Sequence, residues 1–184
     1  MSDDRRDELR ERTVASRRVY DGRVVKLRVD EVELPGGQRS EREVVEHAGA
    51  VGAVAVTGDW QVLLVRQWRH AVGEVVLEIP AGTREVGESP EQCMRRELIE
   101  EVGHQAGAMR FLAEVYASPG YSAESIHLFL ATELRPQTAA ADFDEQIEVV
   151  AVPFEEALEM CRDGRIRDGK TLAGLLMAAD LLGC

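Results

Sequence analysis

The chain lacks the features of a membrane protein or a secreted protein. No window holds about 18 consecutive apolar residues, so no transmembrane helix is expected. Residues 1–18 alternate acids with arginines and contain no apolar stretch of the kind that a secretory signal needs. The 3 cysteines, an odd and widely spaced set, predict reduced thiols and neither a disulfide framework nor a zinc site. We therefore expect a cytoplasmic protein without a membrane partner.

Positive charge is scarce as well. The 22 Lys and Arg residues stand against 34 Asp and Glu, which gives a net charge of -12, and Lys26 and Lys170 are the only lysines. Such an acidic surface disfavours binding to nucleic acid and suits a protein that gathers cations. A length of 184 residues, 45% of them hydrophobic and 30% charged, predicts one folded domain with at most a modest appendage.

The order of the expected elements predicts an α/β or α+β fold in which helices cover a mixed sheet. Residues 14–47 form extended segments around a turn at 35–37, which predicts a small antiparallel N-terminal sheet. We accordingly divide the chain into an N-terminal β segment, 1–47, and a main domain, 48–184. Strands of the main domain are expected at 48–56, 61–69, 75–79, 109–116, 126–133 and 147–152, and helices at 90–102, 154–162 and 171–182.

The helix at 90–102 has clear end signals and an unusual acidic face. Ser89 followed by Gln92 forms a capping box, and Gly103 is the expected left-handed residue at the other end. At about 100° per residue, one apolar stripe of the helix adjoins an arc of three carboxylates. The stripe consists of Met94, Leu98 and Val102, and the arc of Glu97, Glu100 and Glu101.

Three neighbouring carboxylates repel one another, and they lie toward the helix end where anions are disfavoured. The same helical geometry places Arg95 and Arg96 at about 100° and 200° from Met94, away from the carboxylates. Two alternatives remain open on this geometry alone. Either a divalent cation such as Mg²⁺ or Mn²⁺ offsets the repulsion, or the carboxylates form a solvated acidic face.

A longer pattern surrounds these glutamates. Gly82, five residues, Glu88, seven residues, Arg96-Glu97, two residues, Glu100-Glu101, one residue and Gly103 resemble the Nudix box, although His104 replaces the usual apolar residue. The resemblance implies a mixed sheet between helices, and hydrolysis of a nucleoside diphosphate linked to another group with two or three Mg²⁺ or Mn²⁺ ions. It also implies metal ligation by Glu97 and Glu101, by Glu100 as an additional ligand and by the carbonyl of Ala81, with Arg96 orienting a glutamate through an ion pair.

Segments outside the box resemble the ADP-ribose pyrophosphatase subfamily, above all the Ser-Pro-Gly loop at 118–120 followed by an acidic residue. This likeness implies cleavage of ADP-ribose to AMP and ribose 5-phosphate by a homodimer whose N-terminal segments are exchanged. The substrate-binding residues that it implies are Arg69 for phosphate or ribose, Glu85 and Glu124 for ribose hydroxyls, Arg42 and Glu43 for adenosine, and Ser118 and Gly120 of the loop.

The same likeness implies that Glu145, in a loop before the last strand, activates the attacking water or binds a further metal. It would act with Glu100 and Arg96 as the catalytic set. Two other functions remain open on the sequence. One is hydrolysis of another nucleoside diphosphate sugar such as GDP-mannose, and the other is a non-catalytic module that binds ADP-ribose.

Overall fold

The structure, a computed structural model, describes residues 8–137 and 146–184. It divides into two compact units. The smaller unit comprises residues 1–47 with 118–124, and the larger unit comprises 48–117 with 125–184. The loop at 118–124 therefore belongs to the smaller unit although it comes from the middle of the chain.

The larger unit is built on a mixed sheet with the strand order β10-β5-β4-β9-β8, while β6 pairs with β5 and β7 pairs with β4. Only β4 and β9 run parallel; the other described pairs are antiparallel. The strands are β4 (Ala50–Val56), β5 (Gln61–Arg69), β6 (Glu74–Glu78), β7 (Ala81–Thr83), β8 (His104–Tyr116), β9 (Ser125–Pro136) and β10 (Ile147–Pro153).

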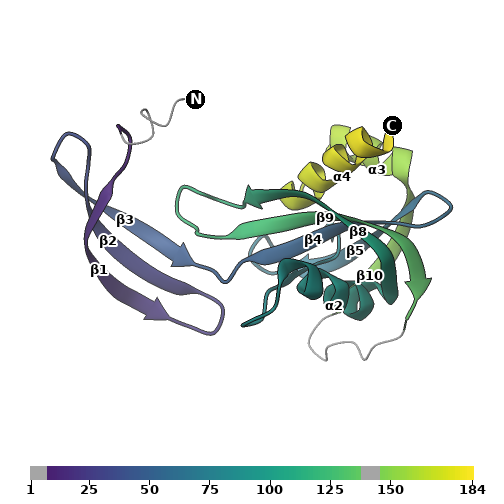
Figure 1. Cartoon of the computed structure of the whole chain (residues 1–184), viewed down its shortest axis with the longest axis horizontal. Coiled ribbons are helices and arrows are strands. Elements are labelled where there is room, and N and C mark those ends of the chain that lie inside the picture. The colour runs from purple at the N-terminus through teal and green to yellow at the C-terminus, as the bar shows by residue number, and fades with distance from the viewer. Residues whose placement is uncertain (1–7, 138–145) are drawn as a thin grey trace. The chain divides into compact units, whose positions relative to one another are not determined.

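Helices cover both faces of this sheet, as Figure 1 shows. Helix α2 (Pro90–Val102) lies on one face, and α3 (Phe154–Arg162) and α4 (Gly169–Leu182) lie on the other. Strand β4 is buried along its whole length, and its alternating side chains enter two hydrophobic cores. Val51 packs in the core beneath α2, and Val54 packs in the core beneath α3 and α4. The predicted fold class is thus confirmed.

The ends of α2 follow the sequence signals closely. The Ser89 hydroxyl accepts the Gln92 N–H at 3.2 Å, and the Gln92 side chain accepts the Ser89 N–H at 3.0 Å. Gly103 ends the helix with φ 67° and ψ 30°, in the left-handed region that glycine tolerates without strain. The apolar stripe is buried as predicted, with Met94 and Leu98 fully inaccessible. These contacts fix the helix about its axis and therefore fix the direction of its glutamates.

Several bounds differ from the prediction, and one strand was not predicted. Strand β8 begins at His104 and not at 109, because its first residues pair with the end of β9 although Ala106 and Gly107 carry little strand signal. The short β7 was not predicted, because a three-residue strand has no readable periodicity. Helix α4 begins at Gly169 and not at 171, since Asp168 caps it by accepting the Thr171 N–H at 2.9 Å.

The smaller unit is a three-stranded antiparallel sheet of β1 (Arg12–Asp21), β2 (Lys26–Glu33) and β3 (Arg39–Glu46). All residues of β1 are exposed. The segment 118–124 joins this sheet through Val45, whose N–H donates to the Tyr121 carbonyl at 2.8 Å and whose carbonyl accepts the Ala123 N–H at 2.9 Å. The predicted small N-terminal sheet is therefore present.

The described residues include no membrane-spanning helix and no disulfide. Within 8–137 and 146–184, no helix has the length and apolar character needed to cross a membrane. Cys93, Cys161 and Cys184 are all free thiols. Burial raises the pKa of the Cys93 thiol to about 12, so this thiol stays protonated at neutral pH.

Candidate active site

Two of the predicted metal ligands meet on the short strand β7. The Glu101 carboxylate accepts the Ala81 N–H at 2.8 Å. The Glu97 carboxylate lies directly against the backbone of Gly82, where a Cβ atom would overlap its carboxyl carbon and Oε1. Both glutamates come from α2, and β7 is held in place by its antiparallel pairing with β4. The buried strand β4 thus holds β7, and the two carboxylates converge on the backbone of β7.

Gly82 is required here for close approach, which leads to a test. Gly82→Ala should push the Glu97 carboxylate away from β7 and weaken Mn²⁺ binding at least about ten-fold, the effect expected when a metal ligand loses its support. Calorimetric titration with Mn²⁺ in the absence of substrate measures this effect. Gly58→Ala is the matched control, because nothing lies within 4 Å of its added Cβ. Equal Mn²⁺ affinity of both variants and the unaltered protein would contradict this placement of Glu97.

The prediction that Arg96 points away from the carboxylates is wrong. Its Nη1 donates to Glu97 at 2.7 Å and to Glu100 at 2.8 Å, and its Nε and Nη2 donate to Glu88 at 3.2 and 3.1 Å. Arg96 and Glu100 are four residues apart, about 40° around the helix, so they share a face, and the long arginine side chain also folds back to reach Glu88 and Glu97. These bonds, led by the one to Glu88, raise the pKa of the Arg96 guanidinium, and the Glu88 pKa is lowered in return.

The arginine pairing bears on whether the site fits a metal. Across 8–137 and 146–184, no three Asp, Glu, His or Cys side chains come together as a ready-made metal site. The carboxylates of Glu101 and Glu97 nevertheless lie against two adjacent backbone residues, Ala81 and Gly82. Their hard oxygen donors suit Mg²⁺ or Mn²⁺. A single guanidinium can neutralise only one of the three carboxylates that it contacts, and Glu101 adds a fourth. The residues therefore fit a divalent cation, with Glu100 attached to Arg96 in this structure.

A buried ion-pair network lies beside this centre. Glu78, only 2% exposed, accepts two bonds from Arg69, from Nε at 2.6 Å and from Nη2 at 2.8 Å. Lys170 at the start of α4 also pairs with Glu78, and it contacts Asp168 at 3.0 Å. Burial raises the pKa of Glu78, but the hydrogen bonds and charges of Arg69 and Lys170 outweigh burial and lower it overall. Glu78 is therefore an ionised carboxylate inside the protein.

Sequence reasoning singled out Arg69 but missed Glu78 and Lys170. Glu78 carries a weak signal, since it is the one carboxylate in the apolar run 75–79, directly before Ile79 and Pro80. Its partner Lys170 follows 92 residues later in the chain. No local pattern connects two residues so far apart.

The remaining predicted site residues are distributed over both units. Arg42, Glu43, Ser118, Gly120 and Glu124 belong to the smaller unit. There the Arg42 guanidinium is paired with Glu11 at 2.5 and 3.0 Å, and Glu124 lies 4.0 Å from the His47 ring.

In the larger unit, Glu85 is exposed in the loop between β7 and α2, where its N–H donates to Glu88 at 3.2 Å. Glu145 lies outside the described residues. Its predicted role as base or metal ligand therefore stays a prediction from the sequence.

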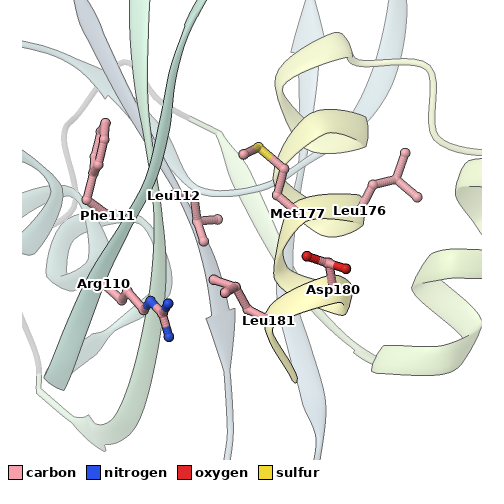
Figure 2. Close-up of a pocket in the computed structure, with 7 residues that line it drawn as sticks. All are labelled: Arg110, Phe111, Leu112, Leu176, Met177, Asp180 and Leu181. Carbon is pink, nitrogen blue, oxygen red and sulfur yellow. The ribbon is translucent and has the colours of Figure 1, made fainter. Parts of the chain in front are cut away.

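A separate hollow of about 390 Å³ opens between β8 and α4, on the face of the sheet opposite α2. Figure 2 shows Leu112 facing Met177 and Leu181 across it, with Arg110 and Asp180 at its margin. None of the predicted site residues lines this hollow. The carboxylate centre on β7 is therefore the candidate active site.

Comparison with known proteins agrees with this geometry. The NUDIX domain matches residues 46–175, and the nucleoside diphosphate sugar hydrolase N-terminal domain matches residues 11–45. The chain therefore belongs to the Nudix family. As a class, the Nudix pyrophosphatases require divalent metal ions.

Several curated relatives are similar over most of their length. The methanol dehydrogenase activator of Bacillus methanolicus is 42% identical over 88% of this chain and 89% of its own. The ADP-ribose pyrophosphatase of Bacillus subtilis is 41% identical over 89% of each chain. The GDP-mannose pyrophosphatase of Salmonella arizonae is 40% identical over 79% of this chain and 82% of its own.

The fold also has a solved counterpart. The crystal structure of an ADP compounds hydrolase superimposes with a TM-score of 0.83 and covers 94% of both chains. At 21% sequence identity, this likeness shows the common fold alone.

Proposed function

We propose that this protein hydrolyses the pyrophosphate bond of ADP-ribose, giving AMP and ribose 5-phosphate. The observation that carries the proposal is the convergence of Glu97 and Glu101 on the Ala81–Gly82 backbone. The identity of 41% to an ADP-ribose pyrophosphatase over 89% of both chains supports the choice of substrate.

The chemistry of the substrate explains the metal requirement. A pyrophosphate is polyanionic, so it repels both the carboxylates of the site and an attacking hydroxide. Two or three Mg²⁺ or Mn²⁺ ions, held by Glu97, Glu101, Glu100 and the Ala81 carbonyl, would neutralise the phosphates and activate water. For Glu100 to take part, its carboxylate has to leave Arg96, which it contacts at 2.8 Å.

The chain's own groups supply orientation and proton transfer. Arg96 holds Glu88 in its ionised form and fixes the directions of Glu88 and Glu97 through ion pairs. Arg69, whose side chain is 44% exposed, offers its remaining N–H groups to a phosphate. Glu145 is our choice for the group that accepts the proton of the attacking water, because the box glutamates are assigned to metal.

The residues assigned to recognition of the adenosine and ribose are those that the resemblance to the ADP-ribose pyrophosphatase subfamily implies. Arg42 and Glu43 would contact the adenosine, and Glu85 and Glu124 the ribose hydroxyls, with Ser118 and Gly120 in the substrate loop. Because β1 is exposed along its length, the smaller unit presents a surface that a second copy can cover. We therefore include a homodimer in the proposal, together with a cytoplasmic location and no nucleic-acid partner.

One alternative substrate has specific support, since a relative of 40% identity is a GDP-mannose pyrophosphatase. We expect Mg²⁺-dependent release of AMP from ADP-ribose with a higher kcat/KM than for GDP-mannose, NADH or diadenosine polyphosphates. Parallel assays of this substrate panel, with and without metal, measure the preference by chromatography of the nucleotide products. Preference for GDP-mannose would transfer the assignment to that substrate. Tight ADP-ribose binding without turnover of any substrate would instead indicate a binding module.

A further inference from the structure

Glu78, at the end of β6, forms ion pairs with Arg69 of β5 and Lys170 of α4. Its carboxylate is deeply buried, with a side chain 3% exposed, while that of Arg69 is 44% exposed. A buried ion pair stabilises a fold little, compared with apolar side chains of the same volume, because both charges must be removed from water. Stability alone therefore gives no reason for a carboxylate and two cations at this place.

The geometry orients the exposed part of Arg69. Glu78 occupies Nε and one N–H of Nη2, which leaves three of the five guanidinium N–H groups for another acceptor. Glu101 is among the groups that raise the Arg69 pKa, so the guanidinium lies within electrostatic range of the carboxylate centre. A rigid fork beside that centre is suited to a phosphate oxygen.

The other side of the network is anchored to α4. Lys170 pairs with Glu78 and with Asp168, and Asp168 accepts bonds from the Thr171 N–H and hydroxyl at 2.9 and 2.6 Å. The Thr171 hydroxyl oxygen in turn accepts the Ile79 N–H at 2.9 Å. The residue after Glu78 is thus fixed to the same helix turn, so Glu78 has little freedom to move.

We propose that Glu78 is a positioning residue that holds the Arg69 guanidinium and the Lys170 ammonium in place to bind the pyrophosphate of the substrate. The inference rests on the proposed function in taking the ligand to be a pyrophosphate. Glu78 itself touches no substrate. It acts through Arg69 and Lys170, the two cations that would bind the pyrophosphate.

The test uses Glu78→Gln, which keeps the shape and removes the charge. We expect KM for ADP-ribose to rise about ten-fold while kcat stays within a few-fold, because a held arginine binds ground state and transition state alike. Binding of inorganic pyrophosphate in the presence of Mg²⁺, followed by calorimetry, should weaken by a similar factor. Arg66→Gln and Glu148→Gln are matched controls, since this pair on the same sheet is exposed and joined at 3.2 Å, and both should leave KM unchanged.

A combined mutant separates positioning from general support. If Glu78 acts through Arg69 and Lys170, adding Glu78→Gln to a variant that carries both Arg69→Gln and Lys170→Gln should raise KM by less than about two-fold over that variant. Fully additive increases, or an unchanged KM and pyrophosphate affinity in Glu78→Gln, would overturn the inference, as would a failure of the unaltered protein to bind pyrophosphate.

A second variant, Lys170→Gln, tests the same inference if Glu78→Gln is unstable. If Glu78→Gln does not fold, Lys170→Gln retains the carboxylate and should still raise KM, though less; an unchanged KM would overturn the inference. The proposed function fails separately if ADP-ribose is not hydrolysed, whatever the pyrophosphate titration shows. In that event, the calorimetric comparison still decides the role of Glu78.

Discussion

Glu101→Gln is expected to lower kcat by at least about 10²-fold, and EDTA is expected to abolish activity altogether. The glutamine keeps an oxygen that can accept the Ala81 N–H, so the position on β7 is preserved while the negative charge is lost. The loss therefore falls on metal binding and hardly on the fold. Steady-state kinetics with saturating Mg²⁺ and Mn²⁺ measure the effect.

Glu91→Gln provides the control on the same helix. Glu91 pairs with Arg95 at 2.8 Å on an exposed face of α2, and its replacement should leave kcat unchanged. In EDTA, the Tm of Glu101→Gln should equal or exceed that of the unaltered protein, since one member of a like-charged cluster is neutralised. Full activity of Glu101→Gln would contradict its assignment as a ligand, and a lower Tm would count against the repulsion among the glutamates.

Removal of residues 1–47 should leave a protein that is poorly folded or at least about 10²-fold less active. The truncation deletes β3 and with it both backbone hydrogen bonds between Val45 and the segment 118–124. Ser118, Gly120 and Glu124 would then lose the strand that holds their loop, in addition to the loss of Arg42 and Glu43. Light scattering and kcat/KM for ADP-ribose report the oligomeric state and the activity together.

A shorter deletion serves as the control for this truncation. Removing residues 1–9 leaves Glu11 in place to pair with Arg42 and keeps all three strands of the smaller unit. This variant should retain its oligomeric state and most of its activity. If the protein without 1–47 were instead a stable and active monomer, the smaller unit would have no part in the substrate site.

The features that sequence reasoning predicted well are those set by neighbours in the chain. The capping box at Ser89, the left-handed Gly103 and the buried stripe of α2 all depend on residues a few positions apart. The spacing from Gly82 to Gly103 indicated the carboxylate centre through its resemblance to the Nudix box. Short-range backbone geometry is regular, so its sequence signals can be read without a structure.

The features that were missed depend on long side chains or on distant partners. The reach of Arg96 to Glu88 and Glu97 depends on its side-chain torsions, which the helical angle of its Cβ does not specify, whereas its pairing with Glu100 is the ordinary contact of residues four apart on a helix. The pairing of Glu78 with Lys170 arises only when α4 packs on the sheet. Tertiary packing also drew 118–124 into the smaller unit.

The parallel pairing of β4 with β9 has a consequence for the order of folding. Ala50 lies opposite Ile126 in this pair, so the two strands meet only after a long loop has closed, whereas the β5–β6 and β8–β9 hairpins need only local contacts. The hairpins and α2 can therefore form early, with the centre of the sheet completed late. Because β7 is paired with β4, the backbone that receives Glu97 and Glu101 becomes fixed only when β4 has taken its place in the sheet. Partly folded chains would then carry the acidic helix without its metal-binding partner, and metal would favour the completed fold by mass action.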